Sequence, residues 1–300
     1  MIIVTTALVT IICWGTWVGL SQTVHFANNY VKTFYITLGN LMLAILVVFI
    51  QQEFHQINMY LIREVFLFPF LGGVIWAIGS FFAFVGTGNI GIARASGIWT
   101  PLNIFMGFLW GIVIFNERFN TNVYLIALLC LSLVLILSGI LMIVFAKGFG
   151  KSISSRKVFV LGLLGSIGAG VLWGSYFIPI KISGVSMWIA NLPFALGMFL
   201  GGIVLLMIGG VKLLLKNKKD YLVGLSAGCL WGIGNFGMLH LSQQIGTAKG
   251  FTISQLSLLV NALIGLYLFK DPKPKTLAAQ LTLAGVLLAG IGGVILGNIK

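Results

Sequence analysis

Polar side chains that lie within long apolar stretches are the residues of this sequence that could do chemistry. Burying such groups in a membrane is costly, so they commonly face another helix or a cavity. They carry hydroxyl, amide or imidazole groups: Thr16, Asn40, Ser80, Asn103, Ser166, Ser175, Asn235, His240, Gln255 and Asn261. Taken singly, each is more typical of a hydrogen bond between helices than of a ligand contact. Their concentration in a few of the stretches favours a shared polar cavity.

Tryptophan residues in the interior of the same stretches add a second kind of contact. They are Trp14, Trp76, Trp99, Trp173 and Trp231. Indole rings stack on apolar C–H faces while amides and hydroxyls bond hydroxyl groups, so a cavity of both kinds suits a neutral polyol. Packing against lipid or another helix accounts equally well for any one ring. These five rings, with the eight polar residues above other than Ser166 and His240, form the candidate binding set.

The acidic residues occupy the ends of the apolar stretches or the loops between them. There are five: Glu53, Glu64, Glu117, Asp220 and Asp271. An exporter of cationic drugs, or simple carboxylate-driven proton coupling, would need a carboxylate in the middle of the membrane, so both are disfavoured. His240 is the histidine best placed to titrate within an apolar stretch. A hydrogen bond between helices is the competing interpretation of His240.

Four charged residues are candidates for gating a cavity. Glu117 and Asp271 occupy equivalent positions, and they either form gate salt bridges with nearby basic residues or mark the membrane interface. Arg94 and Lys249 are a matching pair of cations in turns. They could bind an anionic substrate, gate a cavity or extend toward lipid headgroups, and the last role is the most ordinary.

Composition identifies the elements that must position these residues. The chain is 59% hydrophobic and 8% charged, with a mean hydropathy of +1.09, whereas a soluble domain carries about a quarter charged residues. Each bilayer crossing takes roughly 20 apolar residues, so an all-α integral membrane protein with about ten transmembrane helices is predicted. The predicted spans cover residues 2–21, 33–51, 66–86, 96–116, 123–146, 158–180, 187–211, 221–241, 251–269 and 277–298.

The sequence contains no motif of catalysis or cofactor binding. There is no HExxH, no Gly-x-Ser-x-Gly elbow, no Walker loop and no acidic pair on one helix face, so an enzyme is not indicated. Cys13, Cys130 and Cys229 fall within predicted spans without CxxC spacing. We therefore expect buried free thiols rather than disulfides or a zinc site, and neither a metal nor another cofactor.

The formal charge of +13 comes from basic residues spread over the loops. They do not form one aromatic-interleaved patch, which argues against nucleic-acid binding. Loops after the odd-numbered spans carry thirteen Lys or Arg residues, Lys32 among them, against five on the other side. The positive-inside rule makes the richer side cytoplasmic and places both termini outside the cytoplasm.

The two halves of the chain repeat one another. Trp14-Gly15-Thr16-Trp17 matches Trp173-Gly174-Ser175-Tyr176, and Ile90-Gly91-Ile92-Ala93-Arg94 matches Ile245-Gly246-Thr247-Ala248-Lys249. Likewise, Gly73, Trp76 and Gly79 match Gly228, Trp231 and Gly234. With an odd number of spans in each half, the second half must be inverted relative to the first. The predicted repeats are residues 1–147 and 158–300, joined by a basic linker at 148–157.

The chain resembles a known family in the motifs that carry the repeat. The tryptophan-glycine pairs, the Trp-Xaa-Ile-Gly signature at Trp76 and Trp231, and the Ile-Gly-Xaa-Ala-basic turns resemble the glucose/ribose porter family. These glucose uptake proteins belong to the drug/metabolite transporter superfamily, and the resemblance covers essentially the whole chain. It implies an inverted-repeat carrier in the cell membrane whose cargo is a sugar, alone or together with a proton.

Other functions stay open at this point. A carrier of the same superfamily could export another polar metabolite or a nucleotide sugar, and a non-transporting membrane receptor would have a similar composition. The repeat argues against a receptor, because inverted repeats are typical of secondary transporters with a substrate site near the bilayer midplane. Resemblance at the level of the fold does not choose between cargoes. The expected partners are a small sugar, the lipid bilayer and, where transport is coupled, protons.

Overall fold

The computed structural model describes residues 2–51, 62–115, 122–146, 155–211, 213 and 217–299, and over these residues it contains helices and no strand. The helices of the first half are α1 (Ile2–Gln22), α2 (Asn29–Gln51), α3 (Arg63–Ile90), α4 (Ile92–Val113) and α5 (Val123–Phe145). Those of the second half are α6 (Arg156–Trp173), α7 (Phe177–Ile182), α8 (Met187–Gly209), α9 (Lys218–Ile245), α10 (Thr247–Ser254), α11 (Ser257–Leu263), the π-helical segment η3 (Ile264–Leu268) and α12 (Leu277–Asn298).

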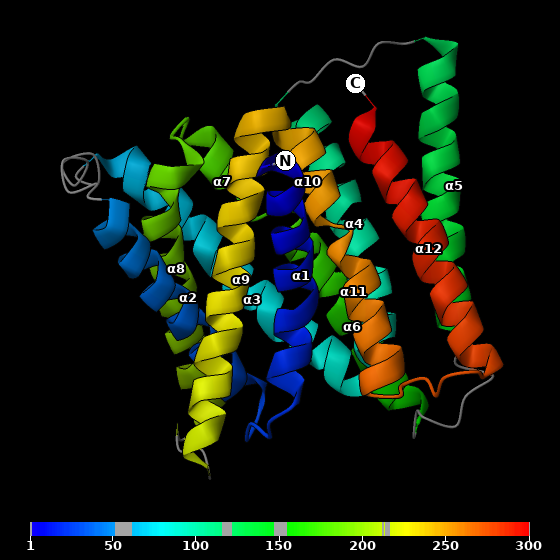
Figure 1. Ribbon diagram of the computed structural model, residues 1–300, viewed down its shortest axis with the longest axis horizontal. Coiled ribbons are helices and arrows are strands. Elements are labelled where there is room, and N and C mark those ends of the chain that lie inside the picture. Colours follow the sequence, from blue (N-terminus) through cyan, green and yellow to red (C-terminus); the bar gives the residue numbers. More distant parts are fainter. Residues whose placement is uncertain are drawn as a thin grey trace.

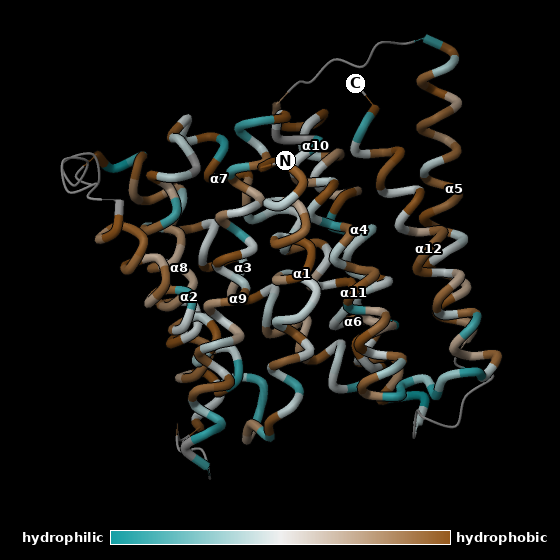
Figure 2. The backbone as a smooth tube through the Cα atoms, viewed as in Figure 1, coloured by the Kyte–Doolittle hydropathy of each residue, from teal (hydrophilic) through white to brown (hydrophobic). Residues whose placement is uncertain are grey.

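Within the described ranges, ten helical stretches are long and apolar enough to cross a membrane. In this count α6 and α7 make one span, and α10, α11 and η3 make another. Figure 2 shows hydrophobic residues along the bodies of the helices and hydrophilic residues concentrated toward the two ends of the bundle. The predicted all-α membrane fold is confirmed.

Both chain termini lie at the same end of the helix bundle (Figure 1), which we call the terminal end. The turn between α3 and α4 and the segment that joins η3 to α12 lie at the other end, which we call the opposite end. The turn between α9 and α10 lies at the terminal end. The two turns that the sequence matched to each other therefore lie at opposite ends of the helix bundle.

Two helix boundaries differ from those predicted. The second span was expected to begin at residue 33, but α2 begins at Asn29, so Lys32 lies in its first turn with only 5% of its surface exposed. The expectation that Lys32 is a loop cation was wrong. In addition, α3 and α4 are separated by Gly91 alone, because both helices extend several residues beyond the predicted spans.

Glycines allow the halves to approach at backbone distance. A Cβ atom added to Gly39 in α2 would collide with the carbonyl oxygen of Leu225 in α9. A Cβ added to Gly197 in α8 would collide in the same way with the carbonyl oxygen of Phe70 in α3. Small residues stabilise such contacts in lipid because they let two helix backbones pack closely. Helices α2 and α9, and α8 and α3, are thus joined by equivalent contacts.

A second equivalence occurs at the turns. Gly91 has φ 81° and ψ 160°, and Gly246 has φ 90° and ψ 149°. Positive φ in this region is accessible to glycine and strained for residues with a Cβ atom. The matching Ile-Gly motifs therefore place glycine where the chain makes the same unusual turn between consecutive helices.

Two spans of the second half are broken. Helix α6 ends at Trp173 before α7 begins at Phe177, and α10 ends at Ser254 before α11 begins at Ser257. Between these helices, Gly174, Tyr176, Gln255 and Leu256 keep right-handed helical backbone angles, so each break is a tightened turn within one span. By contrast, α4 continues as a helix through Pro101.

The close contact at Gly73 generates a stability prediction. A Cβ at Gly73 in α3 would collide with the carbonyl oxygen of Phe194 in α8, whereas a Cβ at Gly88 in the same helix would meet nothing within 4 Å. We expect Gly73→Ala to destabilise the protein by about 1–3 kcal/mol, because the two backbones must separate. Gly88→Ala should be neutral or slightly stabilising, since alanine is the better helix former.

Thermal unfolding of the two purified variants in the same detergent tests this packing. The midpoint should be lower for Gly73→Ala than for the unmodified protein, and it should not decrease for Gly88→Ala. Equal midpoints for the two variants would mean that α3 and α8 are not held at backbone contact.

Candidate functional site

Six tryptophan rings from both halves of the chain gather at the centre of the bundle. We call this group the tryptophan cage, and its members are Trp14, Trp17, Trp76, Trp99, Trp173 and Trp231. The ring centroids of Trp76 and Trp231 are 4.3 Å apart, and those of Trp99 and Trp173 are 5.4 Å apart. Each ring is at most 8% exposed. Helices α1, α3, α4, α6 and α9 all contribute to the cage.

Two indole hydrogen bonds fix the cage to the backbone. Nε1 of Trp14 donates to the carbonyl oxygen of Trp231, and Nε1 of Trp173 donates to the carbonyl oxygen of Trp76, each over 3.2 Å. The four residues are the matched tryptophans of the two predicted repeats. The bonds satisfy the polar atoms of Trp14 and Trp173, leaving these two residues to present ring faces to the cavity.

The polar lining of the cage includes acceptors that no protein group satisfies. Oδ1 of Asn103 and Oδ1 of Asn261 are buried and have no hydrogen-bond partner, and both asparagines line the cavity among the rings. Nδ2 of Asn261 is directed to the carbonyl oxygen of Ser257 at 3.2 Å. A buried acceptor that receives no hydrogen bond destabilises a protein by about 1–3 kcal/mol. A ligand with hydroxyl donors would satisfy both oxygens.

The cavity inside the cage is small in this conformation. Its volume of about 40 Å³ has room for only a few water molecules. Besides the rings and the two asparagines it is lined by Val18, Thr100, Tyr176, Phe251, Gln255 and Ser257. No lining residue is charged, so the cage is suited to a neutral ligand and must widen to enclose one as large as a sugar.

A larger cavity adjoins the cage on the side of the terminal end. This vestibule has a volume of about 210 Å³ and shares Tyr176 and Phe251 with the cage. Its lining includes Leu296 and Ile299 close to the carboxyl terminus. The vestibule therefore connects the centre of the molecule with the terminal end.

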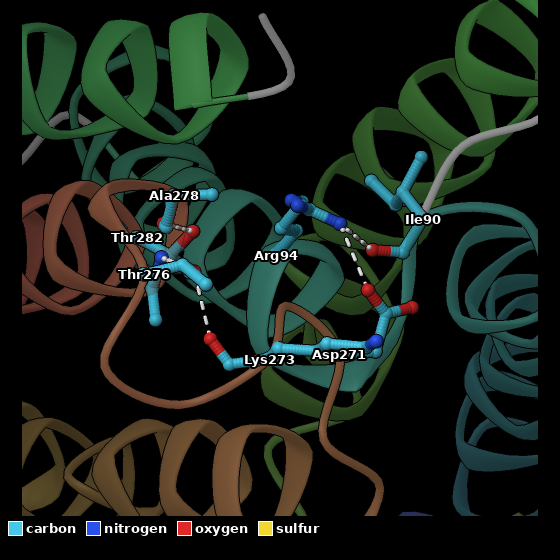
Figure 3. A network of polar contacts seen from close by, with 8 residues as sticks. Ile90, Arg94, Asp271, Lys273, Thr276, Ala278 and Thr282 are labelled. Carbon is cyan, nitrogen blue, oxygen red and sulfur yellow. Dashed lines mark hydrogen bonds and ion pairs between the residues drawn. The ribbon is translucent and has the colours of Figure 1, made fainter. Parts of the chain in front are cut away.

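At the opposite end, an ion pair and a hydrogen bond join segments that are far apart in the sequence. Nη1 of Arg94, at the start of α4, lies 3.1 Å from Oδ1 of Asp271, which follows η3 (Figure 3). Arg94 is fully buried, and Nη1 also approaches the carbonyl oxygen of Ile90 at 3.4 Å. Nearby, Nε2 of Gln22 in α1 donates to Oγ1 of Thr87 in α3 over 2.7 Å.

Lys32 adds a cation to the same region. Its ammonium lies 4.6 Å from the centroid of the Phe84 ring, within the range of a cation–π interaction. Phe84 in turn meets the ring of Trp17 edge-on at 5.9 Å. A chain of contacts thus runs from the buried cation to the tryptophan cage.

Eight of the residues in the candidate binding set line the central cavity. They are Trp14, Trp76, Trp99, Asn103, Trp173, Trp231, Gln255 and Asn261. Asn235 lines the vestibule instead. The structure therefore brings together most of the set around one cavity and assigns Asn235 to the next one.

The remaining four members of the set lie away from the central cavity. Oγ1 of Thr16 donates to the carbonyl oxygen of Ile12, and Oγ of Ser80 donates to that of Trp76. Nδ2 of Asn40 donates to the sulfur of Met198 between α2 and α8. Ser175 accepts a hydrogen bond from the indole of Trp110. Each of the four makes a contact within or between helices.

The gating and coupling candidates are scattered. Arg94 and Asp271 form the ion pair at the opposite end. Lys249 is exposed in α10, and His240 is partly exposed in α9 and lines neither cavity. Glu117 lies outside the described residues. In the part of the chain that the structure describes, no group of three His, Cys, Asp or Glu side chains could hold a metal ion.

The candidate set omitted several residues that line the cage. Trp17 and Tyr176 are the clearest, and a signal for both was present, because they are the matched aromatic residues that end the two Trp-Gly motifs. Trp14 and Trp17 are three residues apart, which puts them on one face of α1. Phe251 and Ser257 had no such signal, because they depend on the break between α10 and α11.

A stability measurement tests whether the cage contains unsatisfied acceptors. We expect Asn103→Leu to leave the free energy of unfolding unchanged or to raise it by about 1 kcal/mol, because it removes a buried oxygen without a partner. Asn40→Leu is the matched control and should destabilise the protein, since Asn40 is hydrogen-bonded to Met198. Thermal unfolding in detergent without added ligand compares them. A larger loss for Asn103→Leu than for Asn40→Leu would contradict this interpretation.

Comparison with known proteins agrees with this architecture. A protein of Listeria innocua that carries the provisional name of sugar uptake protein is 29% identical over 298 residues, with 98% of both chains covered. The glucose uptake protein GlcU of Bacillus subtilis is 25% identical over 299 residues, covering 98% of this chain and 97% of its own. One crystal structure superposes with a TM-score of 0.62 at 15% identity over 99% of each chain, which shows a similar fold.

A family model bears directly on the whole chain. The model described as sugar transport protein matches residues 5–299, so the match includes every helix of the central cage and the vestibule. The chain belongs to the sugar transport protein family.

Proposed function

We propose that the protein is a secondary carrier that moves a monosaccharide, a glucose-like hexose or a ribose-like pentose, across the cell membrane by alternating access. The observation that carries this proposal is the pair of buried acceptors, Oδ1 of Asn103 and Oδ1 of Asn261, without partners inside the tryptophan cage. A monosaccharide has hydroxyl donors for these oxygens and apolar C–H faces for the rings.

The two ends of the molecule support alternating access. The vestibule leads from the terminal end to the cage, while the Arg94–Asp271 ion pair and the Gln22–Thr87 bond close the opposite end. The proposed cycle opens this second end as the vestibule closes. Sites between inverted repeats commonly work in this way, and the paired contacts of Gly39 and Gly197 support a division into repeats 1–147 and 158–300.

The alternatives fit the central cavity less well. A nucleotide sugar carries phosphates that call for cationic partners, and no lining residue of the cage is charged. A receptor without transport has no need of a closure opposite the vestibule. We place the opposite end in the cytoplasm, because exposed basic residues such as Lys157 and Lys273 lie there.

Uptake by purified protein in liposomes tests the proposed function. Labelled glucose or ribose should equilibrate across the membrane faster than in liposomes without protein. Asn261→Leu should slow that uptake about tenfold or more, because the bound sugar loses its hydrogen bond to Oδ1 of Asn261. Transport of amines or nucleotide sugars, without transport of hexoses or pentoses, would overturn the assignment.

A separate prediction concerns proton coupling. If a proton gradient drives accumulation of the sugar, His240→Gln should abolish that accumulation and leave sugar exchange intact.

A second prediction concerns the closure of the opposite end. Asp271→Asn should weaken the ion pair and leave the buried Arg94 charge poorly compensated, a change that commonly costs several kcal/mol. We expect the opposite end to open more often. In a background without Cys13, Cys130 and Cys229, a cysteine substitution at the buried Ser21, whose hydroxyl bonds only its own helix, should then react about tenfold faster with a water-soluble thiol reagent.

The matched control for this prediction is Asp220→Asn, which removes a carboxylate at the same end of the molecule but outside the ion pair. It should leave the labelling rate at position 21 unchanged. Equal rates for Asp271→Asn and Asp220→Asn would show that the ion pair does not hold this end shut.

A further inference from the structure

We infer that the vestibule contains a second sugar-binding site, built on the side-chain amides of Asn191 and Asn235, which receives the sugar before the tryptophan cage opens. The inference rests on the proposed function and adds a site to it. It follows from three features of the vestibule: a hydrogen-bonded pair of buried amides, aromatic rings beside them, and a volume that exceeds that of the cage.

The two amides are held together across helices α8 and α9. Nδ2 of Asn235 donates to Oδ1 of Asn191 over 3.0 Å. Asn191 is 6% exposed and Asn235 is 5% exposed, and both line the vestibule. The bond fixes the orientation of both side chains, so Nδ2 of Asn191 remains as a donor and Oδ1 of Asn235 remains as an acceptor.

A donor and an acceptor side by side match neighbouring hydroxyl groups. One hydroxyl of a vicinal pair can donate to Oδ1 of Asn235 while the adjacent hydroxyl accepts from Nδ2 of Asn191. Every monosaccharide with two free neighbouring hydroxyls has this arrangement. The two neutral amides therefore recognise a pair of neighbouring hydroxyls, and they do not specify one particular sugar.

Aromatic side chains supply the apolar part of the site. Tyr176, Phe177, Phe194 and Phe251 line the vestibule with the two asparagines. The ring centroids of Tyr176 and Phe194 are 5.4 Å apart, and Phe194 lies 6.0 Å from Trp231 of the cage. A sugar on the amide pair would thus lie beside rings that continue into the cage.

The relative volumes set the order of binding. The vestibule offers about 210 Å³, whereas the cage offers about 40 Å³. A monosaccharide is too large for the cage in this conformation, so the first contact in this state takes place at the amide pair. Widening of the cage then transfers the sugar past Tyr176 and Phe251, which belong to both cavities.

Equilibrium binding of radiolabelled glucose and ribose to the protein in nanodiscs tests the second site, and it avoids detergents with sugar headgroups. Asn191→Leu and Asn235→Leu, which lie on different helices, should each weaken binding about tenfold, because each removes one hydrogen bond to the sugar. Asn89→Leu is the matched control: Asn89 bonds the carbonyl oxygen of Val85 in its own helix and lines neither cavity. It should bind as the unmodified protein does.

The cage variant Asn103→Leu/Asn261→Leu separates the two sites. It should lose transport in liposomes, and the weaker binding of glucose or ribose that remains should be reduced about tenfold further when Asn191→Leu is added. If Asn191→Leu leaves that remaining binding unchanged, or if both vestibule variants bind as the unmodified protein does, the second site is overturned while sugar transport itself stands. If the unmodified protein neither binds nor transports these sugars, the proposed function fails first.

Binding of deoxy sugars gives a further test of the contact between the sugar and Asn191. Removing one hydroxyl of the vicinal pair should weaken binding to the unmodified protein but have little additional effect on Asn191→Leu, because the same contact is already lost. Fully additive effects of the two changes would show that the hydroxyl and Asn191 do not meet.

Discussion

A buried hydrogen-bond acceptor without a partner is costly inside a membrane protein, since neither lipid nor an apolar neighbour can replace water. Here two such oxygens, on Asn103 and Asn261, face one cavity from helices of opposite halves. The cost is concentrated at the position where a hydroxylated ligand would remove it. In the proposed carrier, a hydroxylated sugar would supply the hydrogen bonds that these two oxygens lack in the ligand-free protein.

The rest of the bundle must hold these groups in place without blocking movement. Helices α2, α3, α8 and α9 meet through glycines at backbone distance, so the packing relies on close contact rather than on long interdigitating side chains. The ion pair between Arg94 and Asp271 lies at the opposite end, and neither residue lines the cage or the vestibule. This separation leaves the cage neutral. In the proposed cycle, the ion pair would stabilise one of two conformations without binding the cargo.

Much of the fold followed from the sequence because the bilayer imposes a length and a polarity on each helix. The ten predicted spans match the helices within a few residues, and the tryptophans of the repeat meet in one cavity. The sequence did not separate Asn103, which lines the cavity, from Asn40, which bonds Met198 between helices. Lipid and protein interior are both apolar, so the neighbours of a polar residue in the sequence do not reveal which way it faces. The same ambiguity at a helix end made Lys32 look like a loop residue.

In the proposed cycle, the molecule alternates between opening at the terminal end and opening at the opposite end. Distances between paired spin labels measure this most directly. One pair is placed at Lys181 and Lys249, and a second pair at Lys157 and Lys273, all of which are exposed, in protein without its native cysteines. Addition of a transported sugar should add a population with a shorter distance at the terminal end and a longer distance at the opposite end. Distance distributions that stay the same, or that lengthen or shorten together at both ends, would contradict alternating access in this carrier.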